Sequence, residues 1–365
     1  MIAVGIMSGT SADGMDAAAV DVGSGAGQAR PAIRLLAHIA RDHPDGLRYR
    51  ILAAASGAPL PAHDIAILHA ELGDAYASLA REIVAAVGGN AACIALHGQT
   101  IAHFPAEHAT LQIGDAARVA VALGIPAIDD FRSADIALGG QGAPLVPFAD
   151  HLLFADGTPR AILNLGGIAN VTLLPTSDAA DVTAFDTGPG NMVIDHLARK
   201  GGNELDRDGA AAARGRVDRS ALANALTHPY FAREGPKSTG REEFGAPFAQ
   251  QLLSDVRGGG GTLDDAMATA TALTVETVGR ALDGGPWREV IVAGGGARNV
   301  TLVDRLRERT GLPIRLTDEL GIPAEAREAV AFAILGAFRL RDEPNTLPAC
   351  TGASRAVSAG AVHRP

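Results

Sequence analysis

The residues that could do chemistry gather first in the turn MSGTSADGMD, residues 7–16, which lies between two apolar runs. An ordinary hairpin would need only Asn-Gly or Asp-Gly at this point. This turn instead combines glycines and hydroxyls with the carboxylates of Asp13 and Asp16. Amides and hydroxyls donate hydrogen bonds to phosphate oxygens, and carboxylates are ligands for Mg²⁺. The turn therefore predicts a site for a polyphosphate and its metal, with capping of the turn as the alternative role of the carboxylates.

Three further glycine-rich turns each follow an apolar run: LNLGGIANV (163–171), FDTGPGN (185–191) and VAGGGARN (292–299). In sheets with parallel strands, ligands collect at the carboxyl ends of strands and at helix N-termini. One such turn is more often only a tight connection. Together with the opening turn, they suggest two hairpins that clamp a polyphosphate and a base-binding turn beside them.

Lysine is scarce, which limits how phosphates could be bound. The chain has only Lys200 and Lys237 among its 31 basic residues. Lys237 lies in GPKSTGRE, which lacks the spacing of a Walker A loop, and neither lysine lies in a kinase-like VAIK strand. A nucleoside triphosphate would therefore have to be held by backbone amides and hydroxyls.

Composition narrows the class of protein. A length of 365 residues fits two domains, and a hydrophobic content of 47% is ample to bury both cores. A net charge of −10 without a basic run argues against nucleic acid as the main partner. No run of 18 apolar residues and no basic N-terminal region occur, so we expect a cytoplasmic protein that does not engage a membrane. Cys93 and Cys350 lack CxxC spacing and are expected to be buried or incidental thiols.

The elements that must position these turns follow one plan twice. Each half is predicted to begin with three short strands and to continue with helices that alternate with strands. Thr262 and Asp265 have the spacing of a capping box at the start of one helix. The predicted strands are 2–7, 15–22, 33–39, 92–98, 125–129, three between 160 and 188, 288–294 and 313–316; the predicted helices are 63–87, one after Asp115, 190–200, 218–227, 244–256, 262–283, one from Asn299, and 324–340.

Between the halves, residues 129–148 are dense in glycine and proline and lose hydrophobic periodicity. This segment is interpreted as the crossing between domains. Because clefts between domains are favoured ligand sites, Asp130, Arg132, Asp135 and Gln141 could face a polar ligand. A solvated linker is the alternative interpretation.

Seven segments in one order carry a family resemblance: GIMSGTSADGMD, ALHGQTI, DFRSADIALGGQGAPLVP, LNLGGIANV, FDTGPGN, GPKSTGRE and VAGGGARN. In type and order they resemble the motifs of the anhydro-N-acetylmuramic acid kinase family, a branch of the superfamily of acetate and sugar kinases, heat-shock chaperones and actin. The similarity spans residues 5–299 and continues through GIPAEAREAVAFAILG. This chain departs from the family at Ala12, at Thr187, and at Ala326-Arg327, where a bulkier apolar stretch is expected.

The resemblance implies an α/β protein with two ribonuclease-H-like domains of the actin and hexokinase type, each a mixed sheet flanked by helices, and an inter-domain cleft. The N-terminal domain is expected to comprise residues 1–130 and about 341–365, and the C-terminal domain residues 131–340. The implied activity uses ATP and Mg²⁺ to open 1,6-anhydro-N-acetylmuramic acid with water and to phosphorylate it to N-acetylmuramic acid 6-phosphate, which recycles cell-wall sugar. The implied partner is a small sugar, and the resemblance leaves it undecided whether the protein is a homodimer.

The resemblance also distributes roles among residues. Asp186 ends an apolar strand and is the expected base for the attacking water, with an Asx turn as the alternative. Glu328 would help to orient that water unless it lies on an exposed helix surface. Arg132 would pair with the sugar's carboxylate, because its planar fork suits that group. His97, Gln99 and Asp130 would contact the sugar, although a lone histidine is often structural.

The expected nucleotide site draws on all four glycine-rich turns. Asp13 and Asp16 would hold Mg²⁺, and Asn299 would contact the nucleotide or cap its helix. The expected nucleotide-binding residues are Gly9, Thr10, Ser11, Ala12, Asp13, Gly14, Met15, Asp16, Gly166, Gly167, Asn170, Gly188, Gly294, Gly295, Gly296 and Asn299.

Two other classes of protein share this fold. A chaperone-like or actin-like nucleotide switch would use the same phosphate turns, but only a short tail follows the helix that ends near Leu340. A metal-dependent carbamoyl-adenylate transferase should carry an HxxxH pair. None of the eleven histidines has a partner four residues away.

Overall fold

The computed structural model describes residues 1–365 except 10–11, 13, 25–29, 58 and 236. Contacts divide the chain into two compact units. Unit 1 comprises Met1–Leu153 and Ala326–Pro365, and unit 2 comprises Phe154–Glu325. These boundaries differ from those expected from the sequence. The crossing segment and the late helix both belong to unit 1, because they pack on its sheet and on its C-terminal segment.

Unit 1 is built on a mixed sheet of order β13-β7-β4-β1-β2-β3. β1, β2 and β3 are antiparallel neighbours, whereas β4 is parallel to β1 and β7 is parallel to β4. The strands are β1 (Ile2–Met7), β2 (Met15–Val22), β3 (Ile33–Arg41), β4 (Cys93–Leu96), β7 (Ala127–Asp129) and β13 (Ala361–His363).

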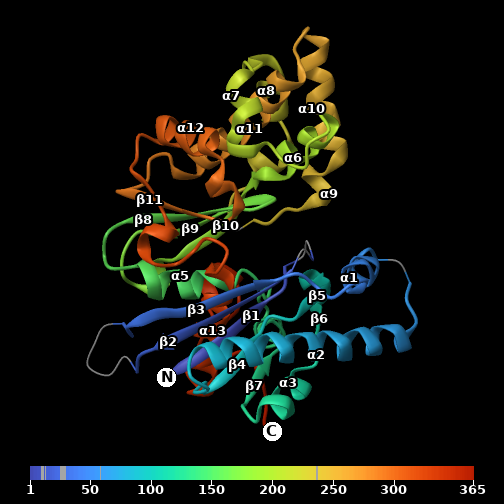
Figure 1. Ribbon diagram of the computed structural model, residues 1–365. Coiled ribbons are helices and arrows are strands. Elements are labelled where there is room, and N and C mark those ends of the chain that lie inside the picture. The colour runs from blue at the N-terminus through green and yellow to red at the C-terminus, as the bar shows by residue number, and fades with distance from the viewer. Residues whose placement is uncertain (10–11, 13, 25–29, 58, 236) are drawn as a thin grey trace. The chain divides into compact units, whose positions relative to one another are not determined.

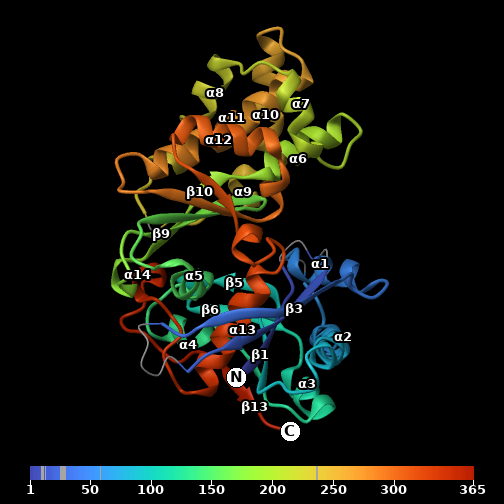
Figure 2. The ribbon, with the colours of Figure 1, turned by 60° about the vertical axis from the view of Figure 1, so that its left-hand side comes forward.

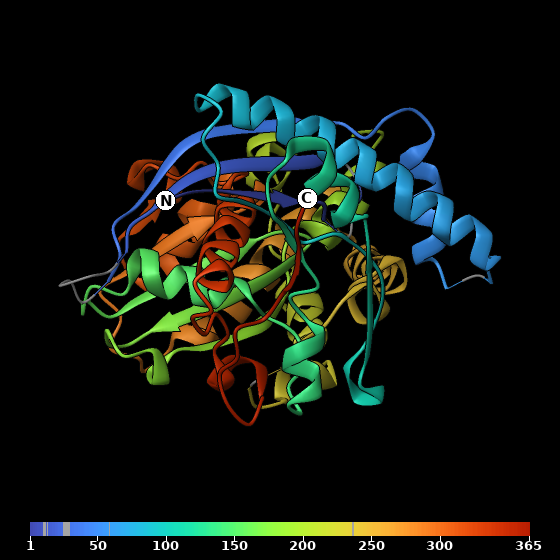
Figure 3. The ribbon, with the colours of Figure 1, turned by 90° about the horizontal axis from the view of Figure 1, so that it is seen from below.

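Helices cover both faces of this sheet (Figures 1 and 3). The helix α2 (Ala62–Ala86) packs its buried Leu72 and Tyr76 into a core that includes Val4 of β1. On the other face, α13 (Arg327–Leu340) approaches so closely that a Cβ at Gly5 would lie 2.0 Å from the carbonyl oxygen of Ala329. The remaining helices of unit 1 are α1 (Leu47–Ala55), α3 (Ala116–Leu123), α4 (Ser133–Ala137), α5 (Val146–Phe154), which ends at the boundary, and α14 (Pro348–Thr351).

Unit 2 repeats the arrangement, with sheet order β10-β9-β8-β11-β12. β8, β9 and β10 are antiparallel neighbours, whereas β11 is parallel to both β8 and β12. Both units therefore have the ribonuclease-H-like strand order 3-2-1-4-5, which confirms the predicted architectural repeat. The strands are β8 (Arg160–Leu165), β9 (Ile168–Leu174), β10 (Thr183–Pro189), β11 (Glu289–Ala293) and β12 (Ile314–Leu316).

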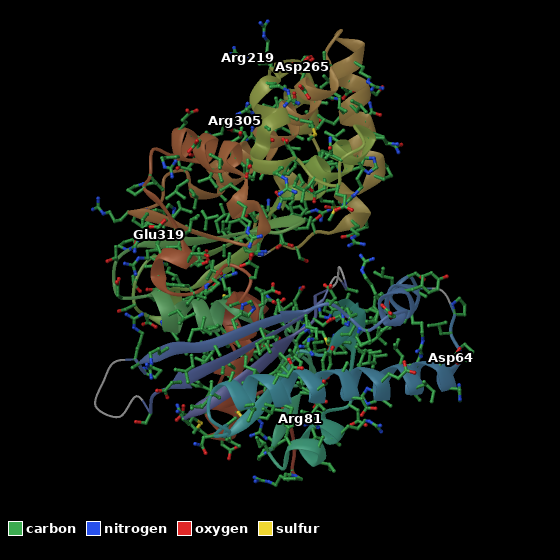
Figure 4. All side chains as sticks on the ribbon, viewed as in Figure 1. Asp64, Arg81, Arg219, Asp265, Arg305 and Glu319 are labelled. Carbon is green, nitrogen blue, oxygen red and sulfur yellow. The ribbon has the colours of Figure 1, made fainter. Side chains whose placement is uncertain are left out.

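In unit 2, α11 (Leu263–Leu282) and α12 (Val300–Thr310) cover one face of the sheet (Figure 2). The predicted capping box of Thr262 and Asp265 is present at the start of α11. Arg305 of α12 donates to the carbonyl oxygens of Ala268 and Ala212, at 3.0 and 2.9 Å, and so ties α12 to two neighbouring helices (Figure 4). The other helices are α6 (Asn191–Lys200), α7 (Ala210–Arg214), α8 (Arg219–Ala225), α9 (Arg241–Phe244) and α10 (Ala246–Gly258).

Several elements of unit 1 carry too little local signal to be predicted. The hairpin of β5 (Gln99–Phe104) and β6 (Ala109–Ile113) is held by its own pairing, and α1, α4 and α5 are short helices fixed by packing. Cys93 and Cys350 are both buried and free, as expected. No helix within the described part of the chain is long and apolar enough to cross a membrane.

Candidate active site

The opening turn of unit 1 connects β1 to β2. Ala12 has a positive φ of 51°, and its N–H donates to the carbonyl of Gly9 at 3.1 Å. The carbonyl of Ala12 accepts from Nε of Arg48 at 3.0 Å. At Gly14 a Cβ would lie 2.8 Å from the carbonyl oxygen of Arg41, so packing itself requires glycine there. The expected site residues Thr10, Ser11 and Asp13 lie outside the described residues.

Buried side chains hold this turn through hydrogen bonds. Ser8 is 1% exposed, and its hydroxyl donates to Oε1 of Gln99 at 2.6 Å. Nε2 of Gln99 in turn donates to the carbonyl of Gly9 at 3.1 Å, and Ser8 also lies 3.2 Å from Nε2 of His43. Gln99, expected at a sugar-binding position, therefore joins the start of β5 to the opening turn.

Of the two carboxylates expected to bind the metal, Asp16 is the one that lies within the described residues. Its Oδ1 lies 3.0 Å from Nε2 of His38, whereas the neighbouring Met15 is buried in the core. Among the described residues, no three His, Cys, Asp or Glu side chains gather as a metal site. Mg²⁺ usually takes only one or two protein carboxylates together with phosphates and water, and ligating groups are themselves held by an outer partner. Asp16 with His38 behind it fits that mode of binding.

His97, Arg132 and Glu328 form a second polar group in unit 1. His97 is 4% exposed, and its Nδ1 lies 2.7 Å from the carbonyl of Gly98, so Nδ1 carries the proton. Nε2 then accepts from Arg132 at 2.7 Å, while the guanidinium also donates to the carbonyl of Gly142 at 2.7 Å. Burial, helped by the Arg132 cation, lowers the pKa of His97 to about 3. His97 is therefore a neutral imidazole with a fixed tautomer.

Glu328 lies in the first turn of α13 and is half-buried rather than exposed. Burial lowers the pKa of Arg132 to about 10, against the opposing effect of the Glu328 carboxylate. Nε of Arg132 is buried without a hydrogen-bond partner. The Arg132 guanidinium thus lies within the field of Glu328 and keeps one buried donor for an acceptor.

Replacing Arg132 with Met is expected to raise the pKa of His97. The cation opposes protonation of the imidazole, but burial is the larger cause, so the pKa should rise and stay below 6.5. Titration of the His97 ring by NMR measures it, with the exposed His63 as the internal control. An unchanged His97 pKa would contradict this reading of the pair.

The other candidates of the crossing segment have local roles in the structure. Asp130 accepts from the backbone N–H and the hydroxyl of Ser133, at 3.2 and 2.6 Å, just before α4. Asp135 is fully buried, and it accepts from the N–H of Gly142 at 2.8 Å and from the hydroxyl of Thr351 at 2.7 Å. The interpretation of this segment as a solvated linker is therefore wrong, and Asp135 is a structural carboxylate.

In unit 2, three polar residues lie side by side across neighbouring strands. Asn170 of β9 is opposite Asn164 of β8 and opposite Asp186 of β10. Residues directly opposite in antiparallel pairs project to the same face of a sheet. The other face carries Leu163 and Val171, which belong to the core. Asn164, Asn170 and Asp186 thus form a half-buried polar row on the face away from α11 and α12.

The surroundings of Asp186 suit a base. Its Oδ2 accepts from the N–H of Thr239 at 2.9 Å, and its own carbonyl accepts from the hydroxyl of Tyr230 at 2.6 Å. Burial raises the pKa of Asp186 to about 6, the Thr239 N–H opposes that rise, and the Glu242 carboxylate adds to it. A carboxylate with a pKa near the working pH is ionised often enough, and basic enough, to take a proton.

The glycines of unit 2 fall into two groups. At Gly166, Gly167 and Gly295 a Cβ would meet nothing closer than 3.4 Å, so packing does not demand glycine. Bare backbone at such places permits the close approach of a ligand. The second group has internal reasons: clashing neighbours at Gly188, Gly294 and Gly296, with positive φ at the first two.

Asn299 caps α12. Its side chain is 8% exposed and accepts from the N–H of Leu302 at 3.0 Å, which confirms the capping role. A Cβ at Gly294 would lie 2.8 Å from Oδ1 of Asn164, so the GGGARN turn lies next to the polar row.

Sequence reasoning missed Asn164, Tyr230 and Thr239. Asn164 stands in the LNLGG motif, and the polar residue in an apolar strand was the available signal. Thr239 stands in GPKSTGRE, which had no assigned role. Nothing in the sequence around Tyr230 indicates that its hydroxyl meets Asp186, 44 residues away.

Comparisons with known proteins agree with this arrangement. The family model for anhydro-N-acetylmuramic acid kinase matches residues 1–365. The enzyme of that name from Gloeobacter violaceus is 44% identical over 99% of this chain and 98% of its own length. The one from Salinibacter ruber is 40% identical over 99% and 96%. A solved structure, the Acidaminococcus fermentans (R)-2-hydroxyglutaryl-CoA dehydratase component A, aligns with 92% of this chain and 96% of its own at a TM-score of 0.47 and 14% identity, too distant to bear on function.

Proposed function

Because the chain belongs to the anhydro-N-acetylmuramic acid kinase family, we propose that it opens the anhydro sugar with water and phosphorylates it from ATP. Its substrate is 1,6-anhydro-N-acetylmuramic acid, and its product is N-acetylmuramic acid 6-phosphate. This is the kinase step of peptidoglycan sugar recycling, and we place it in the cytoplasm, where ATP is available. The observation that carries the assignment of residues is the half-buried carboxylate of Asp186, which accepts a hydrogen bond from the Thr239 N–H.

We assign the base to Asp186. The oxygen of water bonds to the anomeric carbon, the bond from that carbon to the bridging O6 breaks, and Asp186 takes the proton from water. O6 then bonds to the γ-phosphorus of ATP, the bond from that phosphorus to the bridging β-phosphate oxygen breaks, and ADP leaves. A pKa near 6 leaves most Asp186 carboxylates ionised at pH 7. This coupled reaction requires both a base and groups that bind phosphate.

We assign sugar recognition to unit 1. The N–H groups of Arg132 suit the carboxylate of the sugar's lactyl group, and the buried His97 keeps that guanidinium in place. Glu328 balances the Arg132 cation and would orient the water. Gln99 and Asp130 complete the proposed contacts, Gln99 through the turn that it braces.

We assign the nucleotide to the glycine turns. Backbone groups at Gly9 and Gly14 would bind phosphate oxygens together with Thr10 and Ser11, and those at Gly166, Gly167 and Gly295 would lie against the nucleotide. Asp16, with Asp13, would hold Mg²⁺, which when bound neutralises phosphate charge. Catalysis of phosphoryl transfer is mostly positioning and charge stabilisation, which backbone amides can supply without lysine.

Replacing Asp16 with Ala is expected to raise the Mg²⁺ concentration needed for half-maximal turnover by about tenfold or more. Only the phosphate chemistry needs the metal, so the KM of the sugar should change little. Turnover measured across a Mg²⁺ series tests this, with Asp21→Ala at the far end of β2 as the control. Full turnover of the Asp16 variant at limiting Mg²⁺ would remove this residue from the metal site.

The activity as a whole has a direct test. The purified protein is incubated with 1,6-anhydro-N-acetylmuramic acid, ATP and Mg²⁺, and the products are analysed by mass. We expect N-acetylmuramic acid 6-phosphate and ADP in equal amounts. ADP without a phosphorylated sugar would contradict the proposal.

A further inference from the structure

The residue Asp186 lies on β10, which forms one edge of the unit 2 sheet. A residue on an edge strand leaves backbone groups without a partner strand, and buried ones must be satisfied elsewhere. Here the N–H of Asp186 donates to the carbonyl of Lys237 at 2.9 Å, and its carbonyl accepts from Tyr230. With the Thr239 N–H on the carboxylate, residues 230–243 hold Asp186 at three atoms.

This segment is also braced within itself. Nζ of Lys237 donates to the carbonyl of Arg233 at 2.8 Å and lies 4.8 Å from the centre of the Tyr230 ring. Arg233 pairs with Glu243 at 2.5 Å, and Glu243 accepts from the hydroxyl of Thr239 at 2.9 Å. The side chains of these contacts all belong to residues 230–243, of which Pro236 lies outside the described residues. Lys237 links the η4 turn (Pro229–Ala232) to the stretch that reaches Asp186.

We propose that the described part of residues 230–243, with Lys237 and Tyr230 as positioning residues, fixes the carboxylate of Asp186 so that it can take a proton from water. This inference rests on the proposed role of Asp186 as the base. The Lys237 side chain holds its own backbone against Asp186, and the same stretch delivers the Thr239 N–H to the carboxylate. The segment thereby sets both where the base points and how readily it ionises. It also gives the GPKSTGRE motif a role.

The groups that face Asp186 define the expected pH dependence. Glu242 of α9 raises the pKa of Asp186, and the Thr239 N–H lowers it. The same segment carries Arg233, Lys237 and Glu243, and β9 contributes no charged side chain. On α11, Arg280 is paired with Glu276. Loss of the Thr239 contact should therefore raise the pKa of Asp186, whereas loss of the Glu242 charge should lower it.

The test compares Lys237→Met, Tyr230→Phe and Glu242→Gln with Lys200→Met, which changes the other lysine at an exposed helix end. Lys237→Met is expected to lower kcat by about 10–100-fold, the size typical of a base misplaced by about 1 Å, with the KM of ATP and of the sugar within about twofold. The acid limb of its pH profile of kcat/KM should move to higher pH. The base acts in its charged form, and the Asp186 carboxylate has lost the Thr239 N–H that stabilises that form. Glu242→Gln should move that limb to lower pH, and Lys200→Met should leave it in place.

Tyr230→Phe removes a single hydroxyl, so it tests the same idea if Lys237→Met does not fold. The double variant Lys237→Met/Tyr230→Phe should show a smaller fold-loss of kcat than the product of the two single losses, because both residues act on one segment. The inference would be overturned if Tyr230→Phe and a folded Lys237→Met variant both kept the wild-type kcat and the wild-type acid limb of the pH profile. It would also be overturned if the acid limbs of Lys237→Met and Glu242→Gln moved in the same direction. Asp186→Asn separates this failure from failure of the base itself: an active Asn variant rejects the proposed base, whereas an inactive one beside unaffected Lys237 and Tyr230 variants rejects only the positioning role.

Discussion

Replacing Asp186 with Asn is expected to lower turnover by about 10²–10⁴-fold while ATP still binds, because that is the size of a general-base contribution. Asn has nearly the same volume and keeps an oxygen that can accept from the Thr239 N–H. It cannot take a proton from water. Ring opening and phosphorylation should therefore fail together, and product formation from the anhydro sugar measures both.

Water labelled with heavy oxygen supplies a second readout. In the wild-type protein the label should appear on the anomeric carbon, since water attacks there and not at phosphorus. Label in phosphate would indicate simple ATP hydrolysis. Asp195→Asn is a matched control, because Asp195 is a partly buried carboxylate of α6 whose pKa burial also raises to about 6. Turnover of the Asp186 variant within about tenfold of wild type would remove Asp186 from the base role.

The second large effect concerns stability. Arg327 is 4% exposed at its side chain and pairs with the fully buried Asp150, to which its Nε donates at 3.0 Å. Removing one member of such a pair strands a buried charge and typically costs about 3–5 kcal/mol. Arg327→Met is therefore expected to lower the free energy of unfolding by about that amount, measured by denaturant titration.

The exposed pair of Arg118 and Asp74 is the matched control. Asp74→Asn should change the free energy of unfolding by less than about 1 kcal/mol, as surface ion pairs usually do. Combining Arg327→Met with Asp150→Leu should recover much of the loss, since no buried charge is then left alone. A single Arg327→Met variant as stable as wild type would show that the pair contributes little.

Local sequence patterns predicted most of the strands and helices of both units. The predicted span 63–87 and the observed α2 differ by one residue at each end, because apolar residues repeat at helical spacing and Gly88-Gly89 ends the pattern. Helices follow Asp115 and Asn299 as expected, and both side chains cap these helices, since capping depends on neighbours within three residues. Of the elements that were missed, α4 depends on distant contacts such as that of Asp135 with Thr351, whereas the hairpin of β5 and β6 is held by its own pairing.

The sequence by itself determined the family and the repeated architecture, and it indicated Asp186 as the proposed base, because motifs, periodicity and composition are all properties of the sequence alone. Only the tertiary structure decided what surrounds those residues. It placed Arg132 against His97, 35 residues away, and Tyr230 against Asp186, and it paired Arg327 with Asp150 across 177 residues. Such partners meet through packing and register rather than through sequence spacing. The pKa of Asp186, the tautomer of His97 and the burial of Arg327 follow from those contacts, because each depends on which groups lie within a few ångströms and on how much water they exclude.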